Sequence, residues 1–265
     1  MSEPTDTDLI DYTLRLGDDA LISAQRLGEW SAAAPEMEED IALSNIALDQ
    51  LGVARLLLTY AGALAGTGQT EDDLAYLRED RGFRNCLLVE LPNAGPAAAP
   101  GAPGDFGITM AKLLFAAAYQ LLTYEWLAQS SGDERLSAVA AKASKESRYH
   151  LDHASVWTVR LGDGTAESHR RMQAAVDDLW PYTHELFADD PVIDRLADRG
   201  VAPRPSSLRP RWLEISTGVL TEATLTMPED GWAPHGGRSG RHTEHLSYLL
   251  AEMQVLHRAH PGARW

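Results

Sequence analysis

Glu146 and His150 are the residues whose types and spacing most directly suggest chemistry. They stand four positions apart in the stretch 136–162, where apolar residues recur every three or four positions. This spacing predicts an amphipathic helix with both side chains bordering its apolar face. A carboxylate and an imidazole there cost free energy unless each has a partner. The pattern indicates either a buried hydrogen-bonded acid–imidazole pair or half of a metal site, and it favours the pair.

Four long helices in two antiparallel hairpins are predicted to position these residues. The first two helices are joined at Pro35 and the last two at Gly132-Asp133, and short connections of this kind produce antiparallel neighbours. The segment 91–105, rich in Pro, Ala and Gly, is predicted to be a crossover loop between the hairpins. Because no strand pattern occurs, the chain is predicted to be one all-α domain over residues 1–265, a ferritin-like helical bundle with additional C-terminal helices. The core helices are expected over residues 7–33, 36–65, 106–131 and 133–161, and the additional helices over 166–265.

Several acidic residues also stand on the apolar sides of these predicted helices. Carboxylates and neutral imidazoles are ligands that suit iron. In di-iron ferritin-like bundles, one helix of each pair supplies a carboxylate and the other supplies Glu-x-x-His, with all of these side chains pointing inward. The candidate inward residues of this chain are Asp19, Asp49, Glu125, Glu146 and His150.

The histidines of a di-iron site are missing from the positions where they are needed. Gly52 stands three residues after Asp49, and Tyr149 stands three residues after Glu146. His150 is one position further along and still shares a face with Glu146, so one half-site remains open as an alternative. The other half has no imidazole. The pattern therefore favours interior hydrogen-bonded polar groups over a working metal centre.

The remaining polar residues have simpler interpretations. Asn45 is predicted to be an interior polar group bonded to a neighbouring helix, and His153 to be a surface or interface residue. The acidic runs at 36–40 and 71–73 are predicted to be solvated helix starts, where acids complement the helix dipole. No phosphate-binding loop or nucleophile–base motif is present. The histidines near the C-terminus, predicted to lie on solvated or interface faces, are His242, His245, His257 and His260.

Composition narrows the class of protein. The chain has 265 residues, 44% of them hydrophobic, and a net charge of −16. Such a charge would repel a phosphate backbone, so we expect no nucleic-acid partner. Cys86 is the single cysteine, which excludes a disulfide framework within one chain. The polar, acidic N-terminus and the lack of 18 uninterrupted apolar residues lead us to expect a cytoplasmic protein without a membrane span.

Several stretches resemble one family, the C subunits of bacterial phenylacetyl-CoA epoxidases, also called ring-1,2-phenylacetyl-CoA monooxygenases. The likeness extends over nearly the whole chain and is most specific at the C-terminus, because a generic bundle does not require TEHL, LLAEMQ and PGA followed by Trp. The stretches that carry it are EEDIALSNIALDQLGVARLLL (38–58), KESRYHLDH (145–153), DDLWPYTHELF (177–187) and GRHTEHLSYLLAEMQVLHRAHPGARW (240–265).

The resemblance implies a structural, non-catalytic subunit of a ferritin-like epoxidase complex in phenylacetate degradation. In that family the A subunit holds the di-iron centre and binds the CoA ester, and a reductase with flavin and an iron–sulfur centre supplies electrons from NADPH. The complex inserts one oxygen atom of O₂ into the ring of phenylacetyl-CoA. On this basis we expect no cofactor or catalytic residue in this chain. Asp49, Glu125, Glu146 and His150 are then vestiges of a di-iron site.

A partner subunit requires a pairing surface. The helix over 36–65 is apolar nearly all round after residue 40, which predicts a central position and leaves surface that one bundle does not cover. We expect this helix and the one over 241–260 to contribute, with Leu56 and Leu249 as interface residues. Two alternatives remain: a self-sufficient di-iron oxygenase or oxidase with an atypical metal site, and a helical adaptor unrelated to oxygenation. A homodimer in the absence of the partner is also left open.

Overall fold

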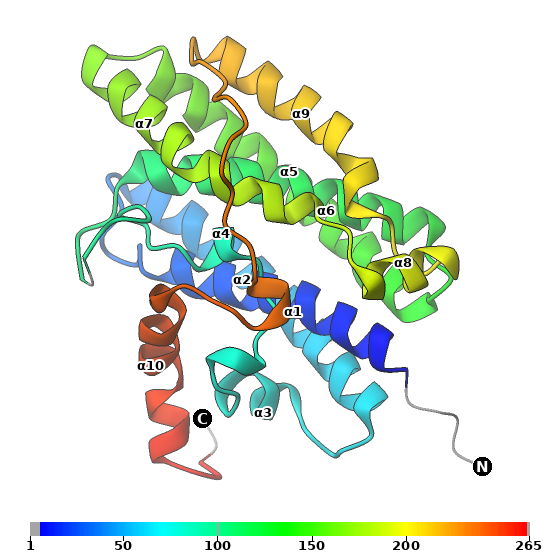
Figure 1. Ribbon diagram of the computed structural model, residues 1–265. Coiled ribbons are helices and arrows are strands. Elements are labelled where there is room, and N and C mark those ends of the chain that lie inside the picture. Colours follow the sequence, from blue (N-terminus) through cyan, green and yellow to red (C-terminus); the bar gives the residue numbers. More distant parts are fainter. Residues whose placement is uncertain (1–5, 100, 264–265) are drawn as a thin grey trace.

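The computed structural model describes residues 6–99 and 101–263, and within these residues it contains helices and no strand. Four long helices form two antiparallel hairpins, as predicted, with α2 packed against α6 between them (Figure 1). Three of these helices have an aspartate at the N-cap, whose side chain accepts hydrogen bonds from backbone amides of the first turn. These residues are Asp6 for α1, Asp105 for α5 and Asp133 for α6. The four are α1 (Thr7–Gly28), α2 (Met37–Ala65), α5 (Phe106–Ser130) and α6 (Glu134–Gly162).

The first helix ends five residues earlier than predicted. Residues 29–36 form a connection in which Ala32 has a positive φ of 60°. The Ala32 amide donates a 2.6 Å hydrogen bond to the Asp40 carboxylate, which closes the turn into α2. The all-α prediction is confirmed despite this shift of one helix end.

Shorter helices surround the two hairpins. The acidic run at 71–73 begins a helix that is only six residues long, and one of the additional helices after residue 166 has only eight residues. Pro181 lies inside α7, which becomes a 3₁₀ helix at His184. The shorter helices are α3 (Glu71–Tyr76), η1 (Asp80–Gly82), α4 (Leu87–Glu90), α7 (Ala166–Thr183), η2 (His184–Phe187), α8 (Pro191–Asp198), α9 (Pro205–Glu222), η3 (Gly237–Ser239) and α10 (Glu244–Ala259).

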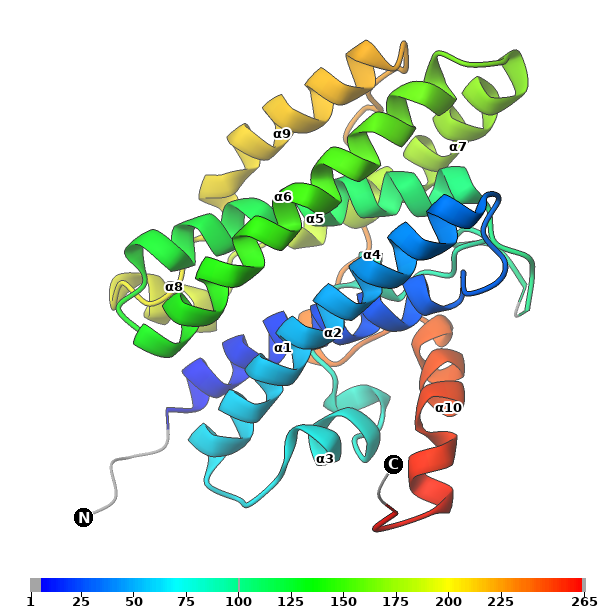
Figure 2. The ribbon, with the colours of Figure 1, turned by 180° about the vertical axis from the view of Figure 1, so that it is seen from behind.

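These elements divide between the two hairpins. α7 and α9 pack on the α5/α6 hairpin, whereas α3 and α10 lie together beside the α1/α2 hairpin (Figures 1 and 2). Residues 226–243, here called the strap, run between the two ends of the molecule and connect α9 to α10 (Figure 1). The strap contains η3 as its only helical turn among the described residues.

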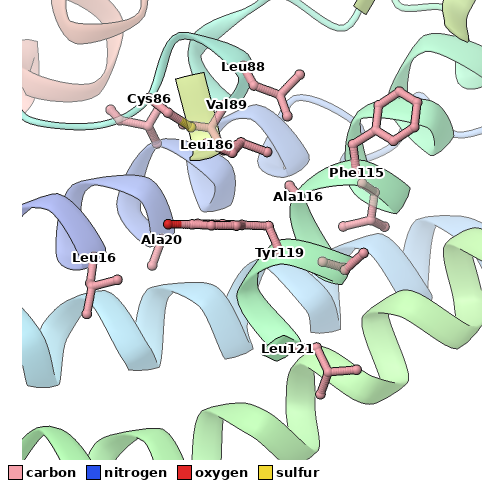
Figure 3. Close-up of a cluster of buried hydrophobic side chains, with 14 of the residues drawn as sticks. Leu16, Ala20, Cys86, Leu88, Val89, Phe115, Ala116, Tyr119, Leu121 and Leu186 are labelled. Carbon is pink, nitrogen blue, oxygen red and sulfur yellow. The ribbon is translucent and has the colours of Figure 1, made fainter. Parts of the chain in front are cut away.

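The hydrophobic core is centred on α5, whose residues are mostly buried. Figure 3 shows the Tyr119 side chain of α5 extending toward Ala20 of α1, with Cys86 and Val89 nearby. The expectation that α2 is the central helix is therefore wrong. α2 buries one side against α1 and α6, and several apolar residues on its other side are exposed.

Candidate functional site

A polar contact inside the bundle joins α2 to α6. His150 is only 2% exposed, and its Nε2 lies 3.1 Å from Oδ2 of Asp49. Burial lowers the pKa of His150, and the hydrogen bond to Asp49 offsets this only in part. A neutral imidazole is consistent with both burial and this bond, because it can donate Nε2–H to the Asp49 carboxylate without carrying a charge. Its Nδ1 is then an acceptor, 3.5 Å from the side-chain nitrogen of Gln50.

Two glutamines occupy the middle of the bundle beside this pair. The side-chain amides of Gln50 on α2 and Gln120 on α5 are both buried and face each other. Gln50 Nε2 donates to Gln120 Oε1 at 2.7 Å, and Gln120 Nε2 donates to Gln50 Oε1 at 3.2 Å. Neither glutamine was predicted from the sequence to be a site residue. The available signal was a pair of amides on otherwise apolar helices, which is too common to point to a site by itself.

An ion pair completes the group at the outer edge of α6. Lys142 Nζ lies 2.8 Å from Glu146 Oε1, and this hydrogen bond raises the pKa of Lys142. Gly52 of α2 faces the ammonium, since a Cβ there would lie 4.0 Å from Nζ. We use the name polar centre for Asp49, Gln50, Gln120, Lys142, Glu146 and His150.

The hydrogen bonds within the polar centre differ from the predicted bond between Glu146 and His150. His150 bonds to Asp49 of the facing helix, and Glu146 bonds to Lys142 one turn earlier on its own helix. The predicted Glu146–His150 hydrogen bond is therefore wrong, because each group has a nearer partner. Sequence spacing indicated the shared face correctly but contained no information about the opposite helix.

Two of the expected inward carboxylates lie elsewhere. Glu125 forms an ion pair with Arg148 across the α5/α6 hairpin at the surface. Asp19 accepts hydrogen bonds from Arg238 of the strap at 2.7 and 2.9 Å and from the Cys86 amide at 2.8 Å. The structure thus brings together Asp49, Glu146 and His150, and it separates Glu125 and Asp19 from them. Asn45, predicted to be interior, is exposed.

Three histidines that were predicted to lie on surface or interface faces are instead buried or mostly buried. One is His245 of α10, whose Nε2 lies 3.0 Å from the Pro96 carbonyl. His153 Nε2 lies 3.1 Å from Glu39 Oε2 between α6 and α2, so Glu39 is not simply part of a solvated helix start. His242 lies on the strap, with Nδ1 2.7 Å from Glu90 and Nε2 3.1 Å from the Phe83 carbonyl. Both ring nitrogens of His242 face acceptors, which identifies a buried imidazolium–carboxylate pair.

The residues of the polar centre do not fit a di-iron site. Two amides occupy the middle, and the Lys142 ammonium repels a bound cation. Amide nitrogens are not ligands, and amide oxygens bind iron less well than carboxylates do. Within residues 6–99 and 101–263, no three His, Cys, Asp or Glu side chains are grouped in a way that could hold a metal ion.

Comparisons with known proteins agree with the resemblance seen in the sequence. A sequence model of the phenylacetic acid catabolic protein family matches residues 1–265. The chain is 47% identical over 255 residues to the C subunit of the 1,2-phenylacetyl-CoA epoxidase of Escherichia coli (strain K12), covering 96% of this chain and 98% of the relative. The match to the family model, the 47% identity to this relative over nearly its whole length and the helical fold lead to one conclusion. The chain belongs to the phenylacetic acid catabolic protein family.

Proposed function

We propose that this chain is the non-catalytic structural subunit of a 1,2-phenylacetyl-CoA epoxidase in phenylacetate degradation, and that it pairs with and stabilises a ferritin-like, di-iron A subunit. The supporting observation is the polar centre, in which amides and an ammonium occupy the space between the helices. The relative named as the C subunit of such an epoxidase supports the assignment to this complex. Di-iron chemistry then belongs to the A subunit, and NADPH, flavin and iron–sulfur chemistry to a reductase.

In this proposal the polar centre has a structural task. The Asp49–His150 bond fastens α2 to α6, and the reciprocal amide bonds of Gln50 and Gln120 fasten α2 to α5. Buried polar pairs of this kind hold neighbouring helices in a single register, because a shifted arrangement would leave their donors and acceptors unpaired. The scaffold therefore presents a fixed outer surface to its partner.

The outer face of α2 is the pairing surface that we propose. Leu48 is 64% exposed, and Ile41 and Leu56 are also exposed on this helix. Tyr149 and Val156 of α6 are exposed beside it, and Figure 2 shows α2 and α6 together on one side of the molecule. We use the name α2 face for Ile41, Leu48, Leu56, Tyr149 and Val156. Apolar surface of this extent on a soluble domain is characteristic of a protein interface.

Lipid is a weaker candidate for covering this face. α2 and α5 are both long and apolar enough to cross a membrane by length and composition. However, 89% of the relevant α5 window is buried inside the bundle. α2 carries the exposed charge Arg55, and the α6 half of the surface carries Lys142 and Arg148, which oppose burial in hydrocarbon. A paralogous helical bundle with its own polar rim fits this mixture of groups better.

Leu249 cannot belong to the pairing surface. It is only 2% exposed and lies in the hydrophobic core of the molecule, where α10 packs against its neighbours. The expectation for Leu249 is therefore wrong, and we leave α10 out of the proposed pairing surface, whereas Leu56 is exposed on α2. A charge at position 249 would disrupt folding and would not report on pairing.

Co-purification tests the proposed surface. Leu48→Arg and Leu56→Arg each introduce a charge into the α2 face, and we expect both to abolish co-purification with the A subunit while circular dichroism remains helical. Leu256→Arg, at an exposed apolar residue of α10, is the matched control and should leave pairing intact. Undiminished pairing of the Leu48→Arg/Leu56→Arg double variant would refute the proposed surface.

One observation favours the alternative of a self-sufficient oxygenase or oxidase. Oε2 of Glu146 is buried and has no hydrogen-bond partner. A carboxylate oxygen in that state is a potential ligand. Iron analysis of protein purified from iron-rich cells distinguishes the two functions: we expect only substoichiometric iron, and tightly held iron in every chain, or turnover of the thioester by this chain alone, would support the alternative.

A further inference from the structure

Lys112 of α5 is a buried amine that forms no ion pair within the part of the chain that the structure describes. Its side chain lies under the start of the crossover loop and is only 6% exposed. Nζ donates to the Leu91 carbonyl at 2.6 Å and to Asn93 Oδ1 at 3.1 Å. Both acceptors are neutral oxygens. An ammonium in such a place costs free energy, because two neutral hydrogen bonds do not replace the water that it loses.

The nearest charged groups lie on α1, and together they do not compensate Lys112. The positive charge of Arg26 opposes the charge of Lys112, whereas the negative charge of Glu29 favours it. Glu29 is already bound to Arg26 by an ion pair at 2.5 Å. Burial is the largest effect, and it lowers the pKa of Lys112 from the ordinary 10.5 to about 7.

The other charged groups of the neighbouring elements are bonded elsewhere. Glu90 of α4 forms an ion pair with His242 of the strap, and Asp105 accepts hydrogen bonds from the first turn of α5. His245 of α10 bonds through its ring to a carbonyl of the crossover loop. None of these groups bonds to Lys112, so its charge state depends mainly on whether water can reach it.

The groups that cover Lys112 belong to the two ends of the crossover loop. We use the name loop base for residues 91–93 and 104–105, where the chain leaves α4 and enters α5. The Asn93 carbonyl accepts a hydrogen bond from the Asp105 amide at 2.8 Å, which joins the two ends. The Asn93 side chain also donates to the Arg26 carbonyl at 2.6 Å and to Glu29 at 2.9 Å. A movement of Asn93 would therefore uncover Lys112 and separate the ends of the loop.

Water cannot surround Lys112 while the loop base is in place. The cleft beside Lys112, which Ser23 and Leu113 also line, has a volume of about 20 Å³ and room for about one water molecule. A much larger groove of about 590 Å³ borders the loop base, which contributes Pro92 and Asn93 to its lining. Full hydration of the ammonium therefore requires the loop base to move, and this movement also changes the wall of the large groove.

We propose that the loop base is a proton-linked cover, which opens more readily when Lys112 carries a proton and closes more firmly when it does not. The physical reason is linkage between proton binding and opening. In the closed state the amine is neutral above about pH 7, whereas a hydrated lysine in the open state keeps its proton up to about pH 10.5. Between these values the open state binds one more proton, so its population should fall by up to tenfold for each unit of rising pH. Below about pH 7 both states carry the proton, and the dependence should end.

Hydrogen exchange in the intact chain tests this inference. Exchange of the loop-base amides is followed by mass spectrometry from about pH 6 to 9, and each rate is divided by that of an unstructured peptide at the same pH. We expect the opening constant to fall by up to tenfold per unit above about pH 7 in the wild type. In Lys112→Met, whose side chain takes up no proton, it should not change with pH.

Two control variants separate Lys112 from the other groups that titrate. Lys145→Met removes an exposed lysine of α6 and should keep the wild-type dependence. His242→Asn should keep it as well, because the pKa of His242 is raised and its loss of charge at rising pH weakens the strap, which is a change of the opposite sign. The same dependence in Lys112→Met as in the wild type would overturn the inference.

Lysine resonances supply a second measurement that needs no variant at position 112. The chain has only three lysines, Lys112, Lys142 and Lys145, so labelling of lysine Cε with ¹³C gives three side-chain signals. Lys142→Arg and Lys145→Arg identify the two exposed ones. The Lys112 signal should titrate near neutral pH, whereas Lys142, whose pKa the Glu146 bond raises, should stay protonated up to about pH 9. A Lys112 signal that is still protonated at about pH 9 would contradict the proposed cover.

Discussion

The polar centre and the anchored strap are both built from buried charged and polar groups, but they differ in how completely those groups are paired. In the polar centre, Glu146 retains an unpaired oxygen and Lys142 is largely open to solvent. At the strap, the fully buried Glu90 accepts hydrogen bonds from His242, from Asn85 and from both the amide and the hydroxyl of Thr243. The comparison indicates that the strap depends on its charges for folding, whereas the charged pair of Lys142 and Glu146 in the polar centre contributes less to stability.

The largest expected effect is at Glu90. In Glu90→Gln the His242 imidazolium loses its buried counter-charge, and breaking a buried ion pair of this kind costs about 3–5 kcal/mol. We expect the free energy of unfolding, measured by urea denaturation, to fall by this amount. Glu146→Gln, which removes the more open carboxylate of the polar centre, should cost clearly less. Equal losses in the two variants would mean that the regions do not differ as we infer.

The glutamine pair should show an intermediate effect with a characteristic non-additivity. Gln50→Leu leaves the buried Gln120 amide without its partner, which costs about 1–3 kcal/mol. Gln50→Leu/Gln120→Leu removes both amides and should recover most of that loss, because apolar groups of similar size then pack together. A double-mutant cycle by thermal unfolding measures the coupling. If the two losses simply add, the amides do not act as a pair.

The two buried histidines should respond to pH in opposite directions. Burial opposes the charge on His242, but the bonds to Glu90 and to the Phe83 carbonyl together raise its pKa above the ordinary 6.5. Its contribution to stability is therefore full below pH 6.5 and is lost as the pH rises through the raised value. Burial lowers the pKa of His150, so its contribution is present above pH 6.5 and is lost as the pH falls through the lowered value.

Single-histidine variants separate these two dependences. The free energy of unfolding is measured for wild type, His242→Asn and His150→Asn from about pH 5.5 to 9. The difference between each variant and wild type is then plotted against pH. Because one proton is involved, the slope of each plot should stay below about 1.4 kcal/mol per pH unit. We expect the alkaline loss of stability to disappear in His242→Asn and the acidic loss to shrink in His150→Asn. Matching slopes of the same sign would contradict the assigned protonation states.

The smallest effect is expected at Glu125. Its ion pair with Arg148 lies at the surface, and exposed pairs contribute about 0–1 kcal/mol. Glu125→Gln should therefore unfold within this range of wild type in chemical denaturation. A loss as large as that of Glu90→Gln would show that Glu125 still belongs to the buried centre.

Sequence periodicity and the connecting residues were sufficient to predict the four long helices and their two hairpins, and the resemblance of several stretches indicated the family. It also identified Glu146 and His150 as residues on one inward-bordering face, and the absence of His at positions 52 and 149 is a property of the sequence alone. Periodicity could not predict which side chains bond to one another. Glu146 shares a face with both Lys142 and His150, and only the position of α2 relative to α6 determines that His150 bonds to Asp49.

The helical register of each segment follows from local sequence, because the 3.6-residue period fixes which side chains share a face. The tertiary structure alone decided which apolar faces are covered: Leu249 is buried while Leu48 is exposed, although both lie on helices with apolar faces. It also decided that Asp19, Glu90 and Glu185 converge on the strap from α1, α4 and η2. The physical reason is that burial and ion pairing are properties of facing elements far apart in the chain, and local spacing contains no information about what packs opposite.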